Sequence, residues 1–128
     1  MISNKSSFNT YGIDFDYRTS YLFAAVSGKV EGFGGFKQFW HRIAEEIRKT
    51  EYEKLLIFQD IEKTVSLAEM FEVASEIPQV FPGIRIAMVD KYKEHQKVNE
   101  FCEIVATNRG ARKKVFATVE AAEEWLLL

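Results

Sequence analysis

The hydrophobic pattern of this 128-residue chain switches repeatedly between a period of two residues and a period of about 3.6 residues. The first period is that of a β-strand and the second that of an α-helix. Strand-like segments fall at 13–18, 21–28, 54–60, 84–90 and 113–118. Helix-like segments fall at 33–47, 67–77, 94–108 and 118–127. The resulting order, ββαβαβαβα, predicts an α/β fold.

The links between these segments predict how the strands pair. A short polar link joins 13–18 to 21–28, which is typical of an antiparallel hairpin. Helices separate the later strands, so we expect them to pair in parallel through right-handed crossovers. The sheet is therefore predicted to be mixed and mostly parallel, in a single domain over residues 13–128 that follows a polar tail over residues 1–12.

Composition and charge exclude several classes of protein. The 17 basic and 19 acidic side chains give a formal charge of −2 and are spread along the chain, so a general nucleic-acid binder is not expected. No apolar run approaches the roughly 18 residues of a membrane span. The first residues lack the basic and apolar regions of a signal peptide, and the single cysteine, Cys102, forms no internal disulfide. We expect a cytoplasmic protein.

The chain lacks the common signatures of catalysis and cofactor binding. It contains no GxxxxGK phosphate loop, no GxGxxG dinucleotide fingerprint and no HExxH metal motif. His41 and His95 lie far apart in sequence, and no nucleophile can be paired with a base. We therefore predict a protein that is not an enzyme and needs no cofactor or metal.

Residues 58–69, "FQDIEKTVSLAE", carry two hydroxyls at the start of a predicted helix. Ser66 and Glu69 have the spacing of a capping box, in which each side chain accepts a hydrogen bond from the backbone of the other. This predicts a structural role for Ser66. Thr64, Ser66 and Glu69 are also the candidates for a phosphoacceptor or a partner contact.

Two aspartates end neighbouring apolar strands. Asp60 follows 54–59 and Asp90 ends 84–90. Ligands of open α/β sheets bind beyond the carboxyl ends of the strands, so Asp60 and Asp90 mark a candidate ligand edge. The alternative is that they are ordinary polar residues at strand ends.

A second candidate site is apolar. It would lie between the first two helices and take a small apolar ligand; its candidate residues are Phe33, Phe36, Trp40, Met70 and Phe71. Aromatic residues at helical spacing are more often core, and that is the alternative. The basic residues Arg109, Arg112, Lys113 and Lys114 suit a solvated strand edge or an anionic partner. The edge strand 13–18 could join two copies in a homodimer.

The element order, the strand ending "IAMVD" and the final "VFATVEAAEEWL" together point to a family. Over about residues 13–127 the chain resembles the STAS-like domains, in particular the bacterial proteins labelled SpoIIAA-like. The resemblance implies a small cytoplasmic regulator that binds a protein partner or a ligand. In the related anti-sigma-factor antagonists a serine at the start of the helix after the third strand is phosphorylated. Thr64 and Ser66 match it by position, although the family's Asp-Ser pair followed by glycine is absent.

These observations give two hypotheses for function. The first is a non-enzymatic regulatory and protein-interaction module, with phosphorylation at Thr64 or Ser66 as its switch and an unknown protein as its partner. The alternative is a small-molecule or lipid-binding domain with an apolar cleft between helices.

Overall fold

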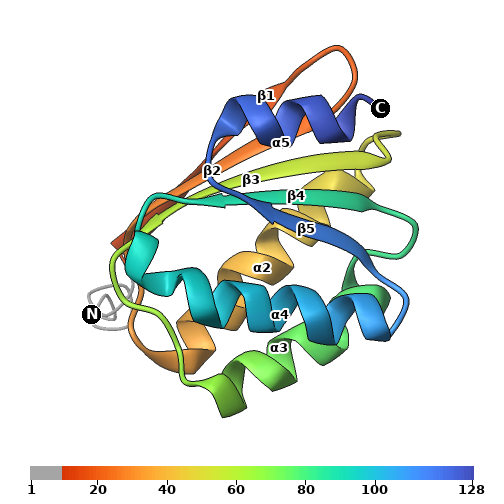
Figure 1. Cartoon of the computed structure of the whole chain (residues 1–128). Helices are drawn as coiled ribbons and strands as arrows, with labels where there is room; N and C mark the ends of the chain where they lie inside the picture. The colour runs from red at the N-terminus through yellow and green to blue at the C-terminus, as the bar shows by residue number, and fades with distance from the viewer. Residues whose placement is uncertain (1–9) are drawn as a thin grey trace.

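The computed structural model describes residues 10–128, which form a five-stranded sheet with helices on both faces (Figure 1). The strands are β1 (Thr10–Tyr17), β2 (Leu22–Lys29), β3 (Lys54–Ile61), β4 (Arg85–Asp90) and β5 (Arg112–Phe116). The helices are α2 (Gly32–Arg48), α3 (Leu67–Val80), the 3-10 helix η1 (Lys93–His95), α4 (Gln96–Asn108) and α5 (Val119–Leu126). This order confirms the predicted α/β topology. β1 includes residues 10–12 of the predicted tail, and residues 1–9 lie outside the described part.

The strands lie in the sheet in the same order as in the sequence, β1-β2-β3-β4-β5. β1 is antiparallel to β2, and the other neighbours are parallel, which confirms the predicted hairpin and mixed sheet. The hairpin requires glycine at position 28. Gly28 has a φ of +113°, and a Cβ there would lie 2.4 Å from the carbonyl oxygen of Thr10.

The helices form two unequal layers. α2, α3 and α4 cover one face of the sheet, and α5 alone lies on the other (Figure 1). The main core, between the sheet and the three helices, includes Phe36, Phe39, Ile43, Ile57 and Ile86. The smaller core beneath α5 is formed by Tyr21, Leu56, Ala87, Val89, Ala122 and Leu126. Because α5 has only eight residues, it covers part of its face.

Two side chains of α3 do not lie where the helical stripe placed them. Met70, Ala74 and Ile77 are buried as predicted, but Leu67 is 56% exposed and Phe71 is 45% exposed. The buried stripe of α3 continues through Val73 instead. Positions 67 and 71 therefore lie to one side of the buried face, because each residue of a helix is rotated by about 100° from the one before it.

Candidate functional site

A groove of about 820 Å³ lies where β4 and β5 end and α4 begins, on the left in Figure 1. Its walls come from the ends of β3, β4 and β5, from the loop after β4 and from α4. We call it the edge groove; it is lined by Phe58, Val89, Asp90, Lys91, Tyr92, Lys93, Gln96, Asn99, Glu100, Glu103, Ile104, Lys114, Val115, Phe116 and Ala117. Its volume is within the usual range for small-molecule sites in proteins.

The apolar floor of the edge groove spans three strands. The register places Phe58 beside Val89 and Val89 beside Phe116, all on the face that α5 covers in part. α5 packs over the earlier residues of this face, Leu56 and Ala87, which are fully buried. Phe58 and Phe116 are only partly buried. The floor therefore belongs to the smaller core, at the carboxyl ends of the strands, where α5 begins.

Three lysines border this floor. Lys91 follows β4, Lys93 lies in η1, and Lys114 lies on β5 with its Nζ 5.7 Å from the ring centre of Phe116. The Lys91 ammonium is 3.5 Å from a carboxylate oxygen of Asp60. Within residues 10–128, no ion pair engages Lys93 or Lys114. The sheet side of the groove is therefore cationic.

Tyr92 also lines the edge groove. Partial desolvation and a hydrogen bond to the Asp60 carboxylate raise the pKa of the Tyr92 hydroxyl above its usual value. The hydroxyl therefore stays protonated at neutral pH. Its single proton is directed to Asp60, so toward the groove the hydroxyl oxygen can act as an acceptor.

Beneath the groove, the carboxylate of Asp90 holds a buried polar network. Its Oδ1 accepts from the backbone N–H of Tyr92 at 2.9 Å. Its Oδ2 lies 3.0 Å from His95 Nδ1 and accepts from Asn99 Nδ2 at 2.9 Å. Gln59 Nε2 donates to the same oxygen at a longer 3.4 Å. Because the side chain is only 4% exposed, this carboxylate fixes the loop and the start of α4.

His95 uses both of its ring nitrogens. Nδ1 faces the Asp90 carboxylate, and Nε2 lies 2.8 Å from the backbone carbonyl of Glu62. Both partners are acceptors, and a neutral imidazole donates from only one nitrogen. The ring satisfies both contacts when it is an imidazolium. His95 thereby ties the end of β3 to the end of β4.

The two aspartates of the predicted ligand edge do lie at one edge of the sheet, as neighbours on β3 and β4. Side chains alternate along a strand, so Asp90 points to the main core with Gln59, and Asp60 points to the face of α5. Both oxygens of Asp90 are occupied by protein donors. His95 and Asn99 were not predicted as site residues. Their spacing of four, soon after a strand-ending aspartate, is the signal that could have indicated them.

Thr64, Ser66 and Glu69 lie at the start of α3 and do not line the edge groove. The capping box is present: Glu69 N donates to Ser66 Oγ at 3.1 Å, and Ser66 N donates to Glu69 Oε1 at 3.0 Å. This confirms the structural role predicted for Ser66. Thr64 and Ser66 are exposed.

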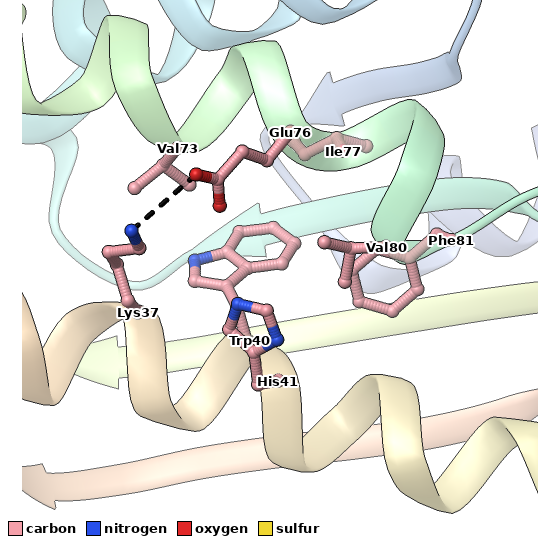
Figure 2. A pocket seen from close by; sticks show the side chains of 8 residues that line it. All are labelled: Lys37, Trp40, His41, Val73, Glu76, Ile77, Val80 and Phe81. Carbon is pink, nitrogen blue, oxygen red and sulfur yellow. Dashed lines mark ion pairs between the residues drawn. The ribbon is translucent and has the colours of Figure 1, made fainter.

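The aromatic residues proposed for an apolar cleft are mostly core. Phe36, Trp40 and Met70 are at most 3% exposed, Phe33 packs against the same core, and Phe71 is exposed. The hollow between α2 and α3 holds about 10 Å³, close to the space of one water (Figure 2). Of the five residues, Trp40 lines it. The space expected between these helices is therefore filled by side chains.

Figure 2 shows how this hollow is closed. Trp40 lies between the two helices, and Lys37 reaches across to Glu76 with its Nζ 3.5 Å from the carboxylate. The indole Nε1 of Trp40 is buried and has no hydrogen-bond partner among residues 10–128. One water in the hollow would give this donor an acceptor.

Lys113 departs from the solvated strand edge predicted for its basic cluster. It lies on the edge strand β5, but it is 3% exposed, and its Nζ has no hydrogen-bond partner in the part of the chain that the structure describes. The ammonium lies 6.0 Å from the ring centre of Trp40. Alternation explains the burial, because the register places Lys113 beside Ile86, on the face of the main core.

The described residues contain neither a metal site nor a membrane-spanning helix. Within residues 10–128, no group of His, Cys, Asp or Glu side chains has the arrangement of a metal site. No helix in the same range combines the length and the apolar character needed to cross a membrane. A scan against models of protein families and a search of the curated proteins found no match to this chain.

Proposed function

We propose that this protein is a non-enzymatic regulatory module that binds a small molecule in the edge groove. The observation that carries the proposal is the groove itself, about 820 Å³ in volume, at the carboxyl ends of parallel strands. It combines an apolar floor with a few polar groups at its rim. This is the usual composition of a ligand site.

The hydrogen-bond contacts of the buried Asp90–His95 pair support a role in binding rather than in catalysis. Asp90 and His95 form a buried acid–base pair beneath the groove, and each oxygen and each ring nitrogen already contacts a protein group. A general base needs a free position within hydrogen-bond reach of the substrate. The pair therefore suits the task of holding the loop that lines the groove.

The resemblance of the sequence to STAS-like domains supports a regulatory role and a cytoplasmic location. Small domains of that type transmit the state of one surface to a partner protein. The free, buried Cys102 is compatible with a reducing compartment. A ligand bound beside the loop after β4 would act through the carboxyl edge of the sheet, where α3 also begins.

A second candidate function is binding of a protein partner at the start of α3. Leu67 and Phe71 are exposed by 56% and 45%, and their spacing of four residues places them on one side of the helix. They follow the exposed hydroxyls of Thr64 and Ser66. A phosphate at either hydroxyl would change the charge beside this apolar pair. A phosphate-sized mass on residues 64–66 of protein isolated from its own cells would support this function.

The test of ligand binding is native mass spectrometry of the protein purified from its own cells, with two matched variants. Ala117 is exposed and lines the groove, so Ala117→Trp fills the groove without disturbing the core. Ala121 is exposed on α5 outside the groove, and Ala121→Trp is the control. We expect a noncovalent small-molecule adduct on wild type and on the control that Ala117→Trp loses. An adduct that persists on Ala117→Trp would contradict the proposed site.

A further inference from the structure

The two sides of the edge groove carry side chains of opposite charge. Its three lysines belong to the strand ends, the loop and η1, whereas Glu100, which is exposed, and Glu103, which is half-buried, belong to α4. Both acids are engaged with the protein. Glu100 accepts from Gln96 Nε2 at 2.9 Å, and Glu103 accepts from the backbone N–H of Val115 at 2.8 Å.

The three lysines of the groove are less constrained by ion pairs and hydrogen bonds than its two glutamates. Lys91 pairs with Asp60 at 3.5 Å while its side chain stays 57% exposed, and Lys93 and Lys114 have no ion pair in the described part of the chain. Lys114 holds its ammonium beside the ring of Phe116. A ligand that rests on the floor therefore meets ammonium groups at its edge.

The floor also limits the shape of the ligand. Phe58, Val89 and Phe116 lie on three adjacent strands, which are spaced by about 4.8 Å each, so the partly buried Phe58 and Phe116 lie about 10 Å apart on either side of the buried Val89. A surface built from one side chain per strand suits a flat body, because aromatic faces gain from stacked contact.

From this arrangement we propose that the edge groove binds a small organic anion with a flat apolar body, such as an aromatic carboxylate or sulfonate. The inference rests on the proposed function and names its ligand class. The flat body lies on Phe58, Val89 and Phe116. The anionic group meets Lys114 and Lys93 at the rim.

Two dyes with related bodies test the ligand class. 8-Anilinonaphthalene-1-sulfonate carries an anion, and N-phenyl-1-naphthylamine has the same rings without it. We expect the sulfonate to bind about tenfold more tightly, and Lys114→Gln to weaken it by about threefold to fivefold, the range of one exposed ion pair. Binding of the neutral dye should not change. Lys49→Gln, on a lysine whose side chain is 73% exposed at the end of α2, is the control.

Ala117→Trp separates failure of the ligand class from failure of the proposed function. Equal binding of both dyes, unaffected by Lys114→Gln but lost in Ala117→Trp, would overturn the anion and leave the groove as a site. Sulfonate binding that Ala117→Trp does not change would overturn both proposals, as would the absence of saturable binding of either dye. The two substitutions are at exposed positions, so the fold should be retained; urea unfolding of each variant checks this.

Discussion

Asp90→Asn is the substitution that most sharply tests the buried network beneath the groove. It keeps the shape of the side chain and replaces one acceptor oxygen with a donor NH₂. Oδ1 can still accept from Tyr92 N, but the new NH₂ group faces His95 Nδ1 and Asn99 Nδ2, which lie 3.0 and 2.9 Å from Oδ2. The two donors would lose their acceptor at a side chain that is 4% exposed.

The cost follows from these two contacts. A buried donor without a partner costs about 1–3 kcal/mol, so two of them give about 2–6 kcal/mol. The imidazole of His95 can recover one contact by accepting from the new amide at Nδ1, which leaves the Asn99 amide as the one donor without its acceptor. We therefore expect a loss of about 1–3 kcal/mol in the free energy of unfolding. A domain of this size has about 5–15 kcal/mol, so the variant should still fold.

Urea unfolding followed by tryptophan fluorescence measures this loss. The control is Asp14→Asn, on an exposed strand residue, which should change the free energy of unfolding by less than about 0.5 kcal/mol. A variant as stable as the control would refute the argument.

Three further predictions concern other parts of the fold, and urea unfolding measures each. Ser66→Ala removes the cap acceptor of α3 and should lower the free energy of unfolding by about 1 kcal/mol; no change would contradict the cap. Lys113→Met replaces a buried, unpartnered ammonium beside Trp40 and should raise it by about 1–2 kcal/mol; a loss would indicate an unseen partner. Tyr21→Phe removes a hydroxyl hydrogen-bonded to Glu123 and should lower it by about 1 kcal/mol at about pH 8. Burial and that hydrogen bond raise the pKa of Tyr21, so the contribution of the hydroxyl is present below about pH 10 and is lost as pH rises through the folded value. The difference between Tyr21→Phe and wild type should therefore shrink at alkaline pH, and a constant difference would contradict this assignment.

Much of the architecture follows from local sequence. The alternation in 13–18, the apolar strands and the helical stripes predict the ββαβαβαβα order, since each period belongs to one kind of element. The capping box of Ser66 is likewise predictable, because it depends on four consecutive residues. The order of elements also brings Asp60 and Asp90 to one edge of the sheet, near the ends of the neighbouring strands β3 and β4; a ligand at that edge stays a prediction.

The groove could not be predicted in the same way. It depends on how far α5 extends over the sheet, and this leaves Phe58 and Phe116 partly uncovered although both belong to apolar strands. Periodicity also gave no indication that Lys113 is buried, because a lysine on an edge strand normally faces solvent. The contact between His95 and the Glu62 carbonyl joins residues far apart in sequence. Such contacts appear only once the strands are packed.

The most direct test of the central claim is to map binding on the protein by amide NMR during titration with 8-anilinonaphthalene-1-sulfonate. If the edge groove is the ligand site, saturable shift changes should concentrate in residues 89–93 and 115–117, and Ala117→Trp should abolish them. Changes concentrated around Trp40 and Phe81, between α2 and α3, or no saturable change at all, would contradict the claim.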